Sequence, residues 1–157
     1  MSVIIKGDYR EVLEEKGVLS FTPNGNSMWP FIKNHKQSVV IEKISRPIDR
    51  LDVLLYVRPD GAYVLHRVVE VLDDGYLMRG DSQFASEKIS KEWVLGIMTF
   101  FYKGEKQISV QDQKYKKQVK RWYRDGAITK LKKKAFNFKG RVKNKLIRNK
   151  NKENKND

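Results

Sequence analysis

Short apolar runs separated by turn residues fill the first 111 residues of the chain. Candidate strands lie at 18–22, 36–44, 52–58, 62–72, 93–102 and 107–110. Pro59-Asp60-Gly61 and Asp73-Asp74-Gly75 favour tight turns, because proline presets φ and glycine tolerates a positive φ. Many short strands with regular turns are typical of antiparallel architectures. The pattern therefore predicts a mainly β domain, built as a twisted antiparallel sheet or a partly open barrel.

A short helix is predicted ahead of the first strand, at about 9–16. Asp8 and Glu11 have the spacing of a capping box, in which an acidic cap is followed three residues later by a glutamate. Gly17 is a suitable C-terminal stop, because glycine accepts the left-handed conformation that ends many helices.

The chain changes character near residue 112. Residues 1–111 hold 15 basic and 15 acidic side chains, whereas residues 112–157 hold 18 basic and 4 acidic ones and account for the net charge of +14. A stripe with helical spacing begins there, formed by Tyr115, Val119, Trp122 and Tyr123. We therefore expect a β domain over 1–111, a basic amphipathic helical tail over 112–143, and disorder over 144–157, where asparagine and lysine predominate.

Three interpretations of the basic tail stay open. A basic helix with aromatic residues can lie on an anionic membrane surface. The same composition can bind the phosphate backbone of a nucleic acid, which we rank below the membrane surface. The tail can also be a solvated segment that serves solubility alone.

Composition argues against several classes of protein. The absence of cysteine excludes disulfides and thiolate metal sites, and two histidines argue against any metal site, so no cofactor is expected. No apolar run approaches the roughly 18 residues of a membrane-spanning helix, and the chain becomes charged too early for a secretory signal. The predicted location is the cytoplasm, and peripheral attachment to the inner face of a membrane is one of the alternatives that the basic tail leaves open.

The clearest candidate for chemistry is Ser27, which lies between Gly25 and an apolar cluster. A serine hydroxyl is a weak nucleophile near neutral pH and needs a base within hydrogen-bond reach. Of the two histidines, His66 lies in a predicted strand and His35 in a polar loop. An unperturbed histidine pKa of about 6.5 suits a general base near neutral pH.

These residues also carry a family resemblance. Gly25-x-Ser27-Met28-x-Pro30, then His66-Arg67-Val68, then Gly80-Asp81, resemble in order and spacing the boxes of signal peptidase I. The match is to the branch that uses histidine as the base, typical of endoplasmic-reticulum and archaeal-type enzymes, and it covers about residues 21–102. The fold that the resemblance implies agrees with the predicted β domain.

The resemblance implies a serine peptidase in which Ser27 attacks the scissile carbonyl and His66 transfers the proton. Asp81 is the first candidate for a carboxylate that orients His66, and Glu87 is the alternative, standing where the family has aspartate. In some signal peptidases a serine two residues before the nucleophile binds the oxyanion. That position is Gly25 here, so backbone N–H groups, including that of Ser27, are expected to do so.

Each of these residues also has a structural interpretation. Met28, Trp29 and Pro30 would line an apolar substrate groove by resemblance, but the same cluster can be core packing. Ser27 can be an ordinary turn residue, and His66 a half-buried strand histidine. Gly80-Asp81 can be a plain turn, and Glu87 a surface charge.

The resulting hypothesis is a serine endopeptidase that removes a signal or leader peptide from a precursor protein. The missing membrane anchor suggests precursors on the cytoplasmic side. Two rival functions stay open. One is a catalytically silent module that holds an extended peptide by strand addition. The other is a regulatory domain related to LexA-type repressors, whose self-cleaving domain shares this fold class.

Overall fold

The computed structural model describes residues 8–124. In chain order the elements are α1 Tyr9–Lys16, β1 Val18–Phe21, β2 Val39–Glu42, β3 Val53–Val57, β4 Tyr63–Leu72, β5 Gly75–Arg79, β6 Glu87–Ser90, the 3₁₀ helix η1 Lys91–Trp93, β7 Val94–Lys103, β8 Lys106–Ser109 and α2 Gln113–Arg124. The predicted helical tail beyond residue 124 and the predicted disorder of 144–157 lie outside the described residues. The chain divides into two compact units, Met1–Lys116 and Lys117–Asp157, so the boundary falls inside α2.

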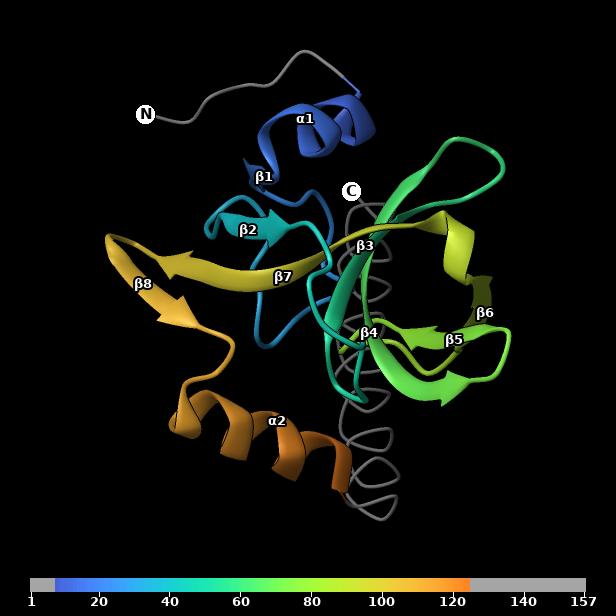
Figure 1. Cartoon of the computed structure of the whole chain (residues 1–157). Helices are drawn as coiled ribbons and strands as arrows, with labels where there is room; N and C mark the ends of the chain where they lie inside the picture. The colour runs from blue at the N-terminus through green and yellow to red at the C-terminus, as the bar shows by residue number, and fades with distance from the viewer. Residues whose placement is uncertain (1–7, 125–157) are drawn as a thin grey trace, which may run out of the picture. The chain divides into compact units, whose positions relative to one another are not determined.

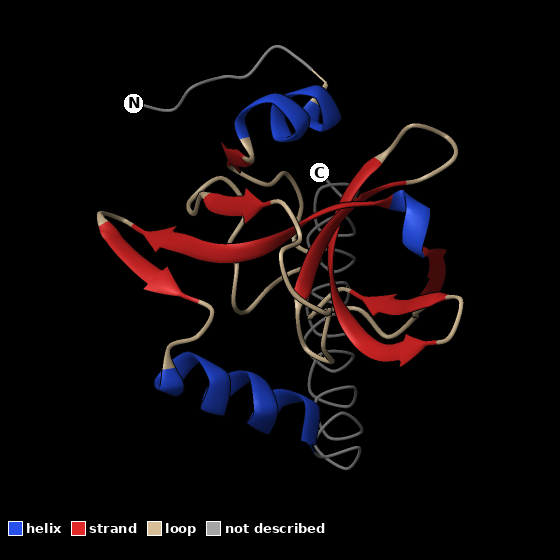
Figure 2. Ribbon diagram, viewed as in Figure 1, coloured by secondary structure: helices blue, strands red, loops and turns tan. Residues whose placement is uncertain are grey.

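Eight antiparallel strands form a single open sheet within the described residues (Figures 1 and 2). The strand order is β1-β2-β7-β3-β4-β5-β6, and β8 pairs with β7. The mainly β fold predicted from the sequence is therefore confirmed, as an open sheet rather than a closed barrel. Strand β6 was not predicted, because Ile89 is the one apolar residue among its four.

Helix α1 forms where the sequence predicts it, and Asp8 and Gly17 cap its two ends. The Asp8 carboxylate accepts a hydrogen bond from the backbone N–H of Arg10 at 2.8 Å. At the other end Gly17 has a φ of 74° and donates its N–H to the carbonyl of Leu13 at 2.9 Å. The positive φ explains why the chain has glycine here.

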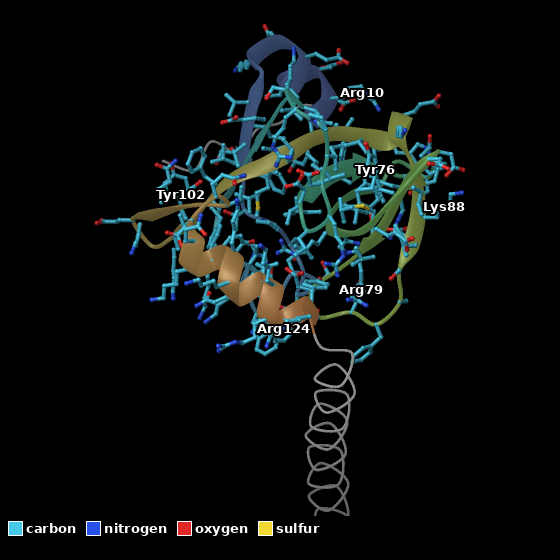
Figure 3. All side chains as sticks on the ribbon, turned by 60° about the horizontal axis from the view of Figure 1, so that its bottom comes forward. Arg10, Tyr76, Arg79, Lys88, Tyr102 and Arg124 are labelled. Carbon is cyan, nitrogen blue, oxygen red and sulfur yellow. The ribbon has the colours of Figure 1, made fainter. Side chains whose placement is uncertain are left out.

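Strand β3 is the most deeply buried element of the sheet, with both faces covered over its first four residues. Leu54 and Tyr56 point into one core cluster, whose other members are Val68, Tyr76 (labelled in Figure 3), Met78, Ile89 and Ile97. Leu55, of opposite parity, is buried on the other face. A continuous apolar sequence is what a strand buried on both faces requires.

Helix α2 contains the predicted aromatic stripe, and its first member is a core residue. Tyr115 is buried, with its ring centroid 5.8 Å from that of Phe31 and 5.2 Å from that of Phe101. The stripe therefore begins as packing rather than as an exposed surface. Among residues 8–124, no helix combines the length and apolarity needed to cross a bilayer.

Candidate functional site

Ser27 lies in the loop between β1 and β2, and its main chain is fixed against the segment that follows β5. The carbonyl of Ser27 accepts hydrogen bonds from the backbone N–H of Ser82 at 2.9 Å and from the Ser82 hydroxyl at 3.1 Å. Gly80 leaves the space for this contact, since a Cβ there would lie 2.8 Å from the same carbonyl oxygen. Gly80 is thus required by close approach, and the predicted Gly80-Asp81 segment does meet the predicted serine.

His66 lies on β4, and the sheet register relates it to the same segment. Arg67 of β4 pairs with Arg79 of β5, so extending the register by one residue places Gly80 across from His66. Residues directly opposite in an antiparallel pair point to the same face. The Ser27 carbonyl packs where the Cβ of Gly80 would be, so the serine loop meets the segment that this register sets across from His66.

Within the described residues, the reactive atoms of Ser27 and His66 have no hydrogen-bond partner. Neither the hydroxyl of Ser27 nor Nε2 of His66 makes a hydrogen bond there, and no direct bond joins them. In this part of the chain, Thr99 Oγ1 is the one buried side-chain polar atom that has no hydrogen-bond partner. Since Nε2 of His66 also has no partner there, it must be accessible to solvent. The backbone N–H of Ser27 is likewise without an acceptor in residues 8–124, as an oxyanion donor would be.

Behind His66 stands a polar network that the sequence did not reveal. The hydroxyl of Tyr56 lies 3.1 Å from Nδ1 of His66 and donates a hydrogen bond to Oε1 of Glu87. Arg58 in turn donates to both oxygens of Glu87, at 3.0 and 2.8 Å. Of the two predicted carboxylates, Glu87 is the one that this network connects to His66.

The surroundings set the charge state of each member of the network. Burial lowers the pKa of His66, although the carboxylate of Glu87 acts in the opposite direction. Partial burial works against the ionised form of Glu87, but hydrogen bonds from Arg58 and Tyr56 outweigh it and hold the pKa of Glu87 below its ordinary value. Burial and the bond to Glu87 raise the pKa of Tyr56. Near neutral pH the site therefore holds a neutral imidazole, a neutral phenol and an ionised carboxylate.

Asp81, the first candidate to orient His66, has a different partner. Both of its oxygens accept hydrogen bonds from Arg67, at 2.7 and 2.8 Å, and both side chains are almost completely buried. Arg67 also donates to the carbonyl of Leu51 and the hydroxyl of Tyr115, and its guanidinium lies over the ring of Phe31. Asp81 pairs with Arg67 and not with His66 because side chains alternate along a strand, and Arg67 points away from the face that His66 occupies.

A groove with a volume of about 320 Å³ runs beside Ser27. Its wall has no charged side chain and combines apolar with polar groups; it is formed by Tyr9, Phe21, Thr22, Pro23, Asn24, Gly25, Ser27, Met28, Ile32, Leu55, Tyr63, Val64 and Leu65. Helix α1 contributes through Tyr9, whose ring lies 5.0 Å from that of Phe21 and 4.8 Å from that of Tyr63. The volume falls within the usual range for ligand sites.

Of the three residues predicted to bind substrate, Met28 alone lines the groove. Met28 and Ile32 are buried and line the groove, whereas Trp29 and Pro30 are not among its lining residues. The loop makes a helical turn here, in which the N–H of Ile32 donates to the carbonyl of Met28 at 2.9 Å. That turn places Met28 and Ile32 on one side and rotates Trp29 outward, where 47% of it is exposed.

Sequence reasoning missed Tyr56 and Arg58, but the hairpin offered a signal for the first. Pro59-Asp60-Gly61 fixes how β3 pairs with β4, and that pairing sets Leu54 across from His66. Tyr56, two residues further along β3, then points to the same face as His66. Arg58 lies beyond the last paired residue of β3, so its side-chain direction was not predictable from the register.

Asp81→Asn is expected to destabilise the fold, because it removes the charge of the carboxylate that pairs with the buried guanidinium of Arg67. Breaking a buried ion pair in this way costs about 3–5 kcal/mol. Denaturant unfolding of the variant measures the loss. Asp74→Asn is the matched control, since Asp74 pairs with Lys88 at an exposed position and its loss should change stability little. Equal unfolding midpoints for the two variants would contradict a structural role for Asp81.

Gly80→Ala is expected to displace Ser27. The new Cβ would lie 2.8 Å from the Ser27 carbonyl oxygen and 2.9 Å from the side-chain oxygen of Gln83; the Gln83 amide can rotate away, but the main chain has to shift. A misplacement of about 1 Å can lower a reaction rate on the order of 100-fold. We expect a serine-directed covalent probe to label Ser27 about 10- to 100-fold more slowly, with folding checked by circular dichroism. Labelling at the unchanged rate would show that Gly80 does not position Ser27.

Metal-binding side chains do not gather at this site: residues 8–124 contain no cluster of three or more His, Asp or Glu side chains able to hold a metal ion. Comparisons of the chain with known protein families and with curated proteins found no match.

Proposed function

We propose that this chain is a serine endopeptidase in which Ser27 is the nucleophile and His66 the general base, and that it removes a signal or leader peptide from a precursor. The observation that carries the proposal is the contact of the Ser27 main chain with Gly80, which the register of β4 and β5, extended by one residue, sets across from His66. That contact unites the three motifs that resemble signal peptidase I. The open Nε2 of His66 and the groove beside Ser27 support it further.

The groove supports an extended peptide as substrate. Residues 63–65 of β4 pair with β3 along one edge, and β5 pairs with β4 only from Arg67 onward. In the described sheet the other edge of this stretch is therefore free to pair with an added strand. The uncharged wall favours peptide segments with small or apolar side chains, because a charged side chain would lose solvation there without gaining a partner.

The proposed chemistry follows the usual course of acyl transfer. Ser27 Oγ attacks the scissile carbonyl while Nε2 of His66 takes its proton. The backbone N–H of Ser27 donates to the oxyanion that forms. Nε2 then returns the proton to the leaving amine as the peptide C–N bond breaks, and water hydrolyses the acyl-enzyme by the same steps. Apo sites often hold such groups further apart than the reacting complex does.

A silent peptide-binding module is the second candidate function, since the structure has a groove but no hydrogen bond between Ser27 and His66. Cytoplasmic precursors, and recruitment to an anionic membrane surface by the basic tail in preference to nucleic acid, stay predictions that accompany the peptidase proposal.

Ser27→Ala and His66→Gln are expected to abolish labelling by a fluorophosphonate probe and cleavage of leader-bearing precursor peptides. Loss of either group from a serine peptidase costs on the order of 10⁶-fold in kcat. Mass spectrometry of the labelled protein identifies the modified serine. Ser20→Ala, on the exposed side of β1, should react as the unaltered chain does. Absence of labelling in the unaltered chain, together with retained peptide binding, would favour the silent module.

The pH dependence of labelling follows from the lowered pKa of His66. The base must be neutral, so the rate rises with pH through the pKa of His66, and that midpoint should lie below the ordinary value of 6.5. The charged and titratable groups that act on His66 are Glu87, Arg58, Asp81 and Tyr56. In Glu87→Gln an influence that raises this pKa is lost, so the midpoint should move to lower pH. A midpoint above 6.5, or an upward shift in the variant, would contradict this assignment.

A further inference from the structure

The phenol of Tyr56 stands between His66 and Glu87. Its oxygen is within hydrogen-bond distance of both partners, whereas Nδ1 of His66 lies 3.8 Å from the nearest carboxylate oxygen. That separation is too long for a hydrogen bond. The hydrogen-bonded path from the carboxylate to the imidazole therefore runs through Tyr56.

Counting protons fixes the direction of each bond along this path. Arg58 holds Glu87 ionised, so the carboxylate can only accept hydrogen bonds. The single proton of the Tyr56 hydroxyl must then point to Glu87, because the reverse orientation would set two acceptor oxygens against each other. The phenol oxygen consequently presents a lone pair to His66, and Nδ1 must carry a proton in order to bond to it.

Packing makes Tyr56 rigid enough for this role. Tyr56 is fully buried in the core cluster of the sheet, together with Leu54 and Val68. The rings of Tyr56 and His66 meet at 62°, with centroids 6.2 Å apart. A buried ring without free rotamers holds its hydroxyl in one place, which is what orientation of a base requires.

We propose that Tyr56 is a positioning residue, which holds His66 as the tautomer protonated at Nδ1 and leaves Nε2 as the basic nitrogen. The proposal rests on the function proposed for Ser27 and His66. When the bond between Ser27 Oγ and the substrate carbonyl forms, the Oγ proton moves to Nε2, and it leaves with the amine when the C–N bond breaks. The protons on Nδ1 and on the Tyr56 hydroxyl stay in place throughout. The opposite tautomer carries its proton on Nε2 and cannot accept another there.

The test is NMR of the whole chain with ¹⁵N-labelled histidine, above pH 7, where His66 is neutral. The sequence has two histidines, so His35→Gln assigns the remaining signals to His66. We expect the unaltered chain to show a protonated Nδ1 and an unprotonated Nε2. In Tyr56→Phe the acceptor for Nδ1–H is lost while the ring remains, and the signals should shift toward the tautomer protonated at Nε2. Tyr102→Phe, which removes a hydroxyl on β7 (Figure 3), should leave them unchanged.

Kinetics provide the second readout. In Tyr56→Phe we expect kcat for peptide cleavage to fall about 10- to 100-fold with KM nearly unchanged, a part of the 10²- to 10⁴-fold that a general base contributes. Glu87→Gln keeps an acceptor for the Tyr56 hydroxyl and should lose less. His66 protonated at Nε2 in the unaltered chain, or an unchanged tautomer in Tyr56→Phe, overturns the proposal even if cleavage is observed. The expected tautomer shift in a chain that neither labels nor cleaves would instead refute the peptidase function and leave the role of Tyr56 in orienting His66 intact.

Discussion

The register of β4 against its two neighbours is the constraint on which the candidate site depends. Pairing with β3 brings Tyr56 to the face of His66, and the β5 register, extended by one residue, sets Gly80, which contacts the serine loop, across from His66. A slip of one residue would turn His66 to the opposite face and put Arg67 in its position. The buried pair of Arg67 and Asp81 opposes such a slip, because it would strand a guanidinium away from its carboxylate.

Two carboxylates near the imidazole have separate tasks, and their environments explain the division. Asp81 is sealed with Arg67 on one side of β4, where it serves the fold. Glu87 is partly exposed and paired with Arg58, so the two charges largely cancel at the imidazole. Burial therefore affects the pKa of His66 more than the net charge of its neighbours does, and His66 stays neutral. A neutral imidazole with one fixed tautomer is ready to accept a proton, which an imidazolium locked in an ion pair would not be.

The sequence predicted the local features well and the long-range ones poorly. Strand and turn positions follow from apolar runs and turn residues, and motif spacing was enough to bring Ser27 and His66 forward as candidates. The partner of Asp81 was not predictable, since it depends on a register between segments that a dipeptide does not encode. Tyr56 was not singled out within the predicted strand at 52–58, because nothing in the sequence shows that its ring packs in the core while its hydroxyl reaches Glu87 and His66. Glu87 was weighed as the alternative to Asp81, because a glutamate stands there where the family has aspartate.

Strand β6 ends the described sheet, and it is four residues long. Short edge strands fray at lower free energy than central strands do, since one side of their backbone lacks a protein partner. Glu87 is the first residue of this strand, whereas His66 and Tyr56 belong to interior strands. Transient opening of this edge strand would move the Glu87 carboxylate away, while the His66 imidazole and the Tyr56 phenol would keep their positions on the interior strands. The hydrogen bond between Glu87 and Tyr56 therefore depends on an edge strand, whereas the contact between Tyr56 and His66 joins two interior strands.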